Sequence, residues 1–388
     1  MSNVGQIPQL RFPEFTGEWQ EKRLGEIGKF YRGLSYDKSN VRSFGNLVLR
    51  SGNIQGGQLI LDQDLQFVDK AIGKQQNLRK GDIVICMANG SKKLVGKAAI
   101  YKGQYSGSIT VGAFCSIFRS NNTLAEYLLQ THQYKKYLNM LLAGTNINNL
   151  KNSDLEKLKF ILPSSEEEQQ KIAAFLAAVD KRVALLERKV QQLEAYKRGV
   201  MQQLFSQQLR FTRPDGSHFP AWQEKRLGEV FDYQQPTSYI VRSTEYKDTY
   251  KTPVLTAGKT FILGYTNETE GVYTNLPATL FDDFTTAVQW VDFPFKVKSS
   301  AVKILKTKAE YNPKIAHELL SRVQFKAENH QRHWISIHQN LSVYMPSLPE
   351  QQKIAAFLSA LDEKISLTRQ QLDKTKQFKK GLLQRMFV

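Results

Sequence analysis

The stretch Glu168-Gln-Gln-Lys-Ile-Ala-Ala-Phe-Leu176 occurs a second time, unchanged, as Glu350-Gln-Gln-Lys-Ile-Ala-Ala-Phe-Leu358. The likeness continues without a gap to Phe205 in the first copy and to Phe387 in the second. A second tag is also repeated, as Trp19-Gln-Glu-Lys-Arg-Leu-Gly-Glu26 and Trp222-Gln-Glu-Lys-Arg-Leu-Gly-Glu229. The residues between tag and repeated segment do not resemble each other in the two halves. The chain therefore duplicates a scaffold that carries two different inserts.

The repeated segments have the pattern of long helices. From Glu166 onward, apolar residues recur at steps of four and three, which is a heptad seam. A shift of 182 positions (350 minus 168) brings the second seam into register with the first, although Thr368 and Thr375 interrupt it. Pro163 and Pro349 lie just ahead of the expected helices, where proline is tolerated. The residues predicted to pair the helices are Ile172, Leu176, Val179, Val183, Leu186 and Val190 in the first copy and Ile354, Leu358, Leu361, Ile365 and Leu372 in the second.

The two helices are predicted to pair with each other as an antiparallel coiled coil. A helix of about 38 residues is roughly 57 Å long. The block of about 143 residues between them should fold to a globule roughly 37 Å across, which is too small to carry the chain back along such a helix. Antiparallel packing needs no such return, and it makes the pair a spacer with one block at each tip. The alternative is that both are ordinary core helices of a larger domain.

The composition is that of a basic, folded protein. Of 388 residues, 41% are hydrophobic and 23% are charged, which is ordinary for folded domains. The formal net charge of +18 favours a polyanionic partner. Nucleic acid is favoured over a membrane surface, because the longest apolar runs fall far short of the roughly 20 residues that span a bilayer. No targeting segment is visible, and Cys86 and Cys115, in strand-like apolar segments, suit free thiols in a reducing cytoplasm.

The expected fold class is mixed α/β (α+β) with an internal pseudo-two-fold repeat. The divergent blocks contain short apolar segments punctuated by glycine, asparagine and proline, which is typical of strands and turns. The expected strands are 46–50, 82–87, 98–101 and 113–118 in the first block and 252–256, 271–274, 278–281 and 301–305 in the second. The expected domains are two globular ones, residues 1–163 and 206–348, and two repeated helices, residues 164–205 and 349–388.

Loops between the expected strands mix cations, amides and aromatic residues. Arginine and lysine neutralise phosphates or donate to guanine, and asparagine can pair with the edge of adenine, so such loops suit the reading of double-stranded DNA. Each loop taken singly is more often a solvated turn, but the net charge favours the DNA-binding interpretation. The candidate DNA-binding residues are Arg32, Tyr36, Lys38, Asn89, Ser91, Lys92, Lys93, Asn146 and Asn148 in the first block and Lys259, Thr260, Tyr265, Asn267, Arg332 and His333 in the second.

Patterns that would indicate catalysis or a metal site are weak. Gly258-Lys259-Thr260 resembles the end of a phosphate-binding loop, but Pro253 stands where that motif needs a glycine. Asp282-Asp283 could bind a metal and Pro214-Asp215 could begin a nuclease site, yet a strand end and a Pro-Asp-Gly turn explain them better. The histidines lack the cysteine or carboxylate neighbours usual for zinc. The sequence therefore predicts no catalytic residue, metal site or cofactor in this chain.

The chain resembles, over essentially its whole length, the specificity subunit of type I restriction-modification enzymes. The resemblance implies that each block is a target recognition domain reading one half of a bipartite DNA site, and that the helices set the unread spacer and dock two methyltransferase subunits. It also implies that S-adenosylmethionine, Mg and ATP belong to partner subunits, which include restriction or motor subunits. The motifs that carry it are the two repeated segments, the Trp19 and Trp222 tags, the helix ends Lys197-Arg-Gly199 and Lys379-Lys-Gly381, Lys80-Gly-Asp-Ile-Val84, Leu255-Thr-Ala-Gly-Lys259 and Phe281-Asp-Asp-Phe-Thr-Thr286.

A repeated scaffold mirrors the two-fold symmetry of the duplex backbone, whereas unlike inserts predict an asymmetric recognition sequence. Two other classes of function stay open at this point. One is a self-sufficient nuclease or methyltransferase with fused recognition domains, which would cleave or methylate DNA alone. The other is a coiled-coil adaptor whose charge serves protein or membrane partners, and its affinity for DNA would be weak and indifferent to sequence.

Overall fold

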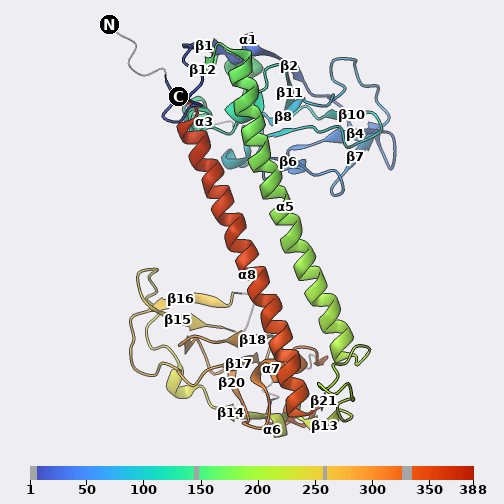
Figure 1. Cartoon of the computed structure of the whole chain (residues 1–388), viewed down its shortest axis with the longest axis vertical. Helices are drawn as coiled ribbons and strands as arrows, with labels where there is room; N and C mark the ends of the chain where they lie inside the picture. The colour runs from blue at the N-terminus through green and yellow to red at the C-terminus, as the bar shows by residue number, and fades with distance from the viewer. Residues whose placement is uncertain (1–6, 144–147, 257–259, 326–333) are drawn as a thin grey trace. The chain divides into compact units, whose positions relative to one another are not determined.

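The computed structural model describes residues 7–143, 148–256, 260–325 and 334–388. The chain divides into two compact units: the first contains residues 1–188 and 369–388, and the second contains residues 189–368. The two repeated segments form the long helices α5 (Glu166–Phe205) and α8 (Leu348–Arg385). Each unit therefore combines one globular domain with part of both helices (Figure 1). The helices do not make a separate domain.

The first globular domain contains two four-stranded sheets, and β5 pairs with β6 in a two-stranded one. The four-stranded sheet with the longer strands, called the larger sheet, is antiparallel and has the order β2-β11-β8-β9; the other, called the smaller sheet, has the order β10-β4-β7-β3. Strand β1 pairs antiparallel with β12, the strand that leads into α5. The helices are α1 (Leu24–Ile27), α2 (Ala125–Leu128), α3 (His132–Ala143) and α4 (Asn152–Glu156). The strands are β1 (Trp19–Arg23), β2 (Gly28–Arg32), β3 (Val41–Arg42), β4 (Asn46–Leu49), β5 (Ile54–Gln55), β6 (Gln58–Leu59), β7 (Gln66–Val68), β8 (Ile83–Cys86), β9 (Ala98–Ile100), β10 (Ile109–Val111), β11 (Cys115–Ser120) and β12 (Lys159–Pro163).

The second globular domain has a four-stranded sheet in the order β14-β20-β17-β18 and a three-stranded sheet in the order β16-β15-β19. Strand β13 pairs antiparallel with β21, which leads into α8. The helices are α6 (Leu227–Val230) and α7 (Pro313–Leu320). The strands are β13 (Gln223–Arg226), β14 (Phe231–Gln234), β15 (Thr252–Leu255), β16 (Ile262–Thr266), β17 (Ala278–Asp282), β18 (Val288–Val291), β19 (Lys296–Val297), β20 (Val302–Thr307) and β21 (Ser342–Met345).

The two inserts share their topology although their sequences diverge. In both larger sheets, the strand that comes first in the chain lies beside the fourth, followed by the second and the third. In both smaller sheets, the central strand, β4 or β15, has an antiparallel neighbour on one side and a parallel neighbour on the other. The duplication therefore extends to the fold of the inserts, which the sequence comparison within the chain does not reveal.

Several boundaries differ from the sequence prediction. Helix α8 begins at Leu348, so Pro349 lies within its first turn rather than ahead of it; the first turn tolerates proline because its N–H groups have no partner within the helix. The segment 271–274 is not a strand, since only Tyr273 pairs, with Phe295. Strand β11 begins at Cys115, because the exposed Ala113 and Phe114 precede it in a turn.

A buried carboxylate joins the N-terminal segment to the start of α5. Arg11 donates from Nε and Nη2 to the two oxygens of Glu168, at 2.7 and 2.8 Å, and Trp19 donates from Nε1 to the same carboxylate at 3.3 Å. The Glu168 side chain is 2% exposed. The pKa of Arg11 is raised by its hydrogen bond to Glu168, against the effect of burial. The tag tryptophan thus has a structural role in orienting a buried ion pair.

The second unit repeats this arrangement of an arginine and a tryptophan around a buried glutamate, which we call the clamp. Arg210 donates to both oxygens of Glu350, at 3.1 and 2.8 Å, and Trp222 donates to Glu350 at 3.2 Å. Glu350 is fully buried. The sequence contains a signal for the clamp that the repeat analysis missed, because Leu-Arg-Phe precedes the tryptophan tag in both halves, ending at Phe12 and at Phe211.

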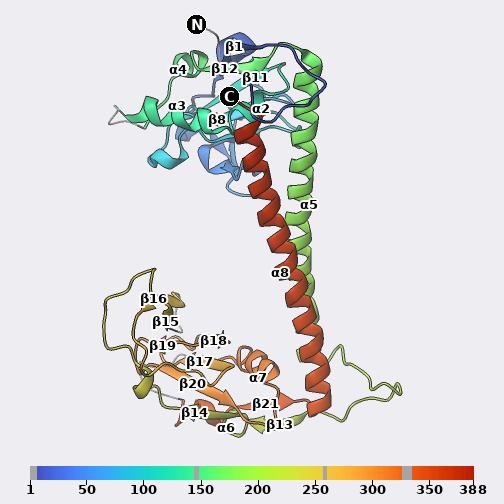
Figure 2. The same ribbon diagram turned by 60° about the vertical axis from the view of Figure 1, so that its left-hand side comes forward.

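The long helices run in opposite directions within each unit. In the first unit, Ile172 and Leu176 near the start of α5 share a hydrophobic core with Leu382 and Leu383 in the last turn of α8 and with Met386 and Phe387 just after it. In the second unit, the end of α5, through Val200 and Leu204, shares a core with the start of α8 (Figures 1 and 2). The shared cores confirm the predicted antiparallel direction, and all of the predicted pairing residues are buried or half-buried.

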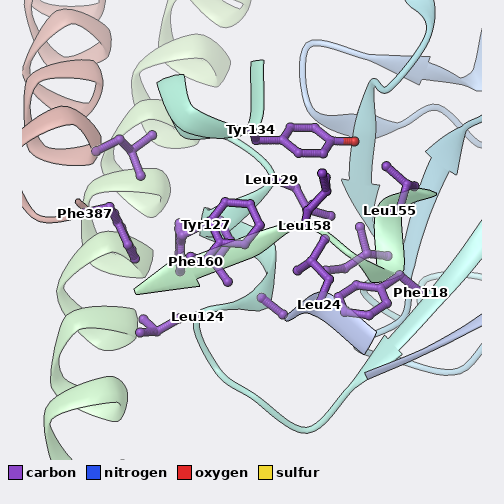
Figure 3. Close-up of a cluster of buried hydrophobic side chains, with 14 of the residues drawn as sticks. Leu24, Phe118, Leu124, Tyr127, Leu129, Tyr134, Leu155, Leu158, Phe160 and Phe387 are labelled. Carbon is purple, nitrogen blue, oxygen red and sulfur yellow. The ribbon is translucent and has the colours of Figure 1, made fainter. Parts of the chain in front are cut away.

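The core of the first domain is continuous with the helix seam. Figure 3 shows Phe387, from the end of the chain, in one cluster with Tyr127, Phe160 and Leu124 of the globular domain. The seam residues at the helix ends therefore pack against a domain as well as against the partner helix. The same holds in the second unit, where Trp222 and Leu227 belong to the cluster of Leu358.

Polar positions in the seam are matched across the helices. Lys197 pairs with Asp362 at 2.5 Å in the second unit, and the equivalent Lys379 pairs with Asp180 at 2.5 Å in the first. Thr368 is buried and donates to the carbonyl oxygen of Lys364 at 2.7 Å, so its hydroxyl is satisfied within α8. These contacts explain why a lysine and a threonine interrupt the apolar seam.

Replacing Arg11 by alanine leaves the Glu168 carboxylate buried without its main partner. Removing one member of a buried ion pair costs about 3–5 kcal/mol, so urea denaturation should show the first unit unfolding at clearly lower denaturant. The matched control is Lys159→Ala, which breaks the half-exposed pair with Glu21 in the same unit and should cost under about 1 kcal/mol. Equal stability of Arg11→Ala and the wild type would contradict the structural role of the clamp.

Candidate nucleic-acid interface

Two loops of the first domain that the sequence predicts to contact DNA lie together. Asn89 donates from its side chain to the hydroxyl of Ser51 at 3.0 Å and accepts from the backbone N–H of Ser91 at 2.9 Å. Asn148 donates to the carbonyl oxygen of Gly90 at 3.1 Å. Both amides therefore support the loops that present their neighbours, and a base contact by either residue stays a prediction. Asn146 lies outside the described residues.

The predicted cations of this domain differ in their surroundings. Lys92 donates from Nζ to the carbonyl oxygen of Leu142 at 2.9 Å, near the end of α3, where the helix dipole favours a positive charge. Lys93 is exposed. Arg32, the last residue of β2, is also exposed, and its carbonyl oxygen accepts from the side chain of Gln76 at 3.1 Å. Lys93 and Arg32 are thus open to solvent, and a phosphate contact by either stays a prediction.

Tyr36 and Lys38 line a hollow of about 520 Å³ in the same domain. The hollow lies where the central strand β4 and the parallel strand β10 end. Its rim and walls include residues that sequence reasoning missed: Arg50, Ser51, Gln66 and Phe114. Ser51 connects it to the loop of Asn89 through their hydrogen bond. An alternating apolar and polar pattern would not single these residues out, because they come from three separate segments.

The described candidates of the second domain lie around the strand β16. Tyr265 is within β16 and half-buried, and Asn267 follows it and lines a shallow hollow with Arg242. Thr260 is exposed, and its carbonyl oxygen accepts from the hydroxyl of Thr256 at 2.6 Å. Lys259, Arg332 and His333 lie outside the described residues.

The acidic groups that the sequence raised as possible catalytic or metal sites have structural partners. Asp283 pairs with the buried Lys303 at 3.0 Å, and Asp282 accepts from the backbone N–H groups of Phe284 and Thr285. Asp215 accepts from Ser217 in its turn. Within the described residues, no group of three or more histidines, cysteines or carboxylates could hold a metal ion.

Burial shifts the pKa values of titratable groups in both domains. Cys86 and Cys115 are free, buried and opposite each other on β8 and β11, as predicted for free thiols, and burial raises the pKa of Cys115 to about 12. Burial lowers the pKa of His317 to about 4, so its imidazole is neutral when it contacts Thr279 at 3.2 Å.

None of the described helices is long and apolar enough to cross a membrane.

The sequence matches the family model for the type I restriction modification DNA specificity domain over residues 16–195 and 221–377. The chain is similar to the EcoR124I/EcoR124II type I restriction enzyme specificity subunit of Escherichia coli, with 46% identity over 143 residues, or 35% of either chain. It is also similar to the StySPI specificity subunit of Salmonella potsdam, with 30% identity over 241 residues, which are 59% of this chain and 50% of that one. The matches thus span half or less of these relatives.

A solved structure, the S subunit of a type I restriction-modification system from M. genitalium, has a similar fold. The TM-score is 0.62, and the superposition covers 98% of this chain and 99% of that one. The sequence identity is 17%, so this likeness concerns the fold alone. It includes both globular domains and both long helices.

Replacing Lys93 by alanine should weaken binding to cognate and random DNA about equally. Loss of one phosphate contact reduces the slope of log affinity against log salt by about one, and the preferred sequence should not change. Titrations of both duplexes over a range of salt concentrations would measure this. Lys22→Ala, an exposed lysine on β1, is the control and should leave the slope unaltered. A changed sequence preference with an unchanged slope would contradict the phosphate assignment.

Proposed function

The chain belongs to the family of type I restriction-modification DNA specificity domains, and we propose that it reads a bipartite, asymmetric DNA sequence for a type I restriction-modification complex. Each globular domain reads one half of the site, and the paired helices set the unread spacer. The observation that best supports this proposal is that both domains share one topology while their loops differ, so the same strand order places unlike side chains at equivalent positions. Two readers of one shape and different chemistry suit two different half-sites.

The chain contributes recognition and no chemistry in this proposal. The carboxylates that sequence reasoning raised are held in an ion pair or in turns. S-adenosylmethionine, Mg and ATP would be bound by methyltransferase and motor subunits. The net charge of +18 supports DNA as the direct partner, since Lys and Arg that neutralise phosphates supply much of the affinity of such proteins.

The test is the sequence preference of the full chain with the methyltransferase subunit of its own system. At moderate salt, selection from a random duplex library should enrich one asymmetric sequence of two parts, bound at least about 10³-fold more tightly than random duplex. The chain alone should neither cleave nor methylate DNA. Binding without sequence preference would remove this function, and methyl transfer by the chain alone would favour a self-sufficient enzyme.

Exposed apolar residues on both helices support docking of two copies of one partner. Leu185 on α5 and Phe378 on α8 are 58% and 55% exposed, both within the first unit. The shift of 182 residues maps Leu185 onto Leu367 and Phe378 onto Tyr196, which are 52% and 55% exposed in the second unit. Exposed apolar groups at equivalent positions fit two identical protein surfaces. We assign these faces to the two methyltransferase subunits.

Aspartate at Leu185 should release one methyltransferase subunit, and aspartate at both Leu185 and Leu367 should release two, because a charge facing an apolar surface is costly to desolvate. Native mass spectrometry of the assembled complex would count the subunits. The matched control places aspartate one position away, at the exposed Ala184 and Ser366, and should keep both subunits. Retention of two subunits by the Leu185 and Leu367 double variant would exclude these faces as the docking surface.

A further inference from the structure

The hollow of the first domain lies where the ends of two strands, β4 and β10, meet at one corner. Arg50 and Ser51 follow the central strand β4, and Gly112 follows its parallel neighbour β10. The N–H of Gly112 donates to the carbonyl oxygen of Leu49 at 2.8 Å, which fixes the two strand ends together. A side chain at Gly33 would lie 2.1 Å from the carbonyl oxygen of Gly112, so glycine is required for the close approach. The ends of β4 and β10 and the segment of Gly33 therefore meet closely at this corner.

The polar lining can donate and accept hydrogen bonds. Arg50 binds Asp64 through Nη2 at 2.5 Å, and its Nε–H is buried with no acceptor among the described residues. Gln66, at the start of β7, is half-buried, and among the described residues its side-chain amide makes a long 3.4 Å contact with the carbonyl oxygen of Phe67. Lys38 is exposed at the rim. A glutamine amide in such a place can both donate to and accept from the edge of a base.

Phe114 adds an exposed aromatic ring to the rim of the hollow. Its side chain is 70% exposed, while its carbonyl oxygen accepts from the N–H groups of Met87 and Ala88 at 2.8 and 3.2 Å. The backbone that carries the ring is thus held firmly, and the ring itself is left in water. An exposed aromatic ring on a held backbone, beside polar groups, is suited to an apolar contact with a base or a thymine methyl group.

The second domain has the same corner with different side chains. The N–H of Lys298 donates to the carbonyl oxygen of Leu255 at 3.0 Å, as that of Gly112 does to Leu49. Likewise the N–H of Val241 donates to the carbonyl oxygen of Val297, as the N–H of Leu34 donates to the carbonyl oxygen of Val111. Thr256 occupies the place of Arg50, and Lys298 that of Gly112. Constant backbone with changed side chains is the arrangement that two half-sites of different sequence require.

We propose that the hollow of the first domain is its base-reading site, that it takes base-pair edges in the major groove of duplex DNA, and that Gln66 and Phe114 determine specificity there. This inference rests on the proposed function and adds the place and the residues. Asn89 and Asn148 act as positioning residues, because they hold the loop beside Ser51. The lysines around the corner contact phosphates and do not select the sequence.

The experiment compares the full chain, assembled with its methyltransferase subunit, with the variants Gln66→Ala and Phe114→Ala. Each variant should lose about 5-fold to 100-fold in affinity for the cognate duplex and keep its affinity for random duplex and its salt slope. Selection from a random library should relax one or two adjacent positions in one half-site only. Phe44→Ala is the matched control, since Phe44 is 79% exposed in the same domain and does not line the hollow.

The outcomes separate this inference from the proposed function. A wild-type complex without any sequence preference overturns both. A wild type that prefers a sequence, together with Gln66→Ala and Phe114→Ala variants that keep the same motif and affinity, overturns the inference alone. A loss that Phe44→Ala shares, or one that affects cognate and random DNA equally, also overturns it, because the effect would then not concern base reading.

Discussion

The buried carboxylate in the first turn of each long helix is the interaction on which both units depend. Glu168 and Glu350 are removed from water, and an unpaired charge in such a place would cost several kcal/mol. Each is acceptable only when an arginine and a tag tryptophan from a distant segment reach it together. The carboxylate therefore forces the N-terminal segment of each half onto a helix start, and the strand that follows the tag enters the sheet from a fixed point.

From that fixed point, the fold tolerates large changes in the inserts. The larger sheets keep one strand order and the smaller sheets keep one central strand, because backbone hydrogen bonds and buried apolar side chains define them. Loop side chains at the strand ends contribute little to this framework. They can vary, as Arg50 and Thr256 do at equivalent places, without a change of topology. Because the sheets do not depend on the loop side chains, one scaffold can present two different surfaces.

The helix pair gains its direction from specific contacts as well as from apolar packing. A heptad seam alone permits either parallel or antiparallel pairing. The equivalent pairs Lys197 with Asp362 and Lys379 with Asp180 connect the late part of one helix to the early part of the other in each unit. A parallel arrangement would leave these half-buried charges without partners. Lys197, which interrupts the apolar seam in the sequence, therefore helps to specify the antiparallel direction.

The sequence by itself determined the repeat, both long helices, their burial pattern and the two-domain order, because heptad spacing and repeated tags are local and periodic signals. Seven of its eight predicted strands correspond to strands of the structure, namely β4, β8, β9, β11, β15, β17 and β20. It did not reveal the shared topology, or the meeting of Arg11 with Glu168, or the corner where Arg50, Gln66 and Phe114 converge. Those depend on contacts between residues far apart in the chain. The repeated Leu-Arg-Phe marks Arg11 but does not say which residue it meets, so only the tertiary structure could decide these contacts.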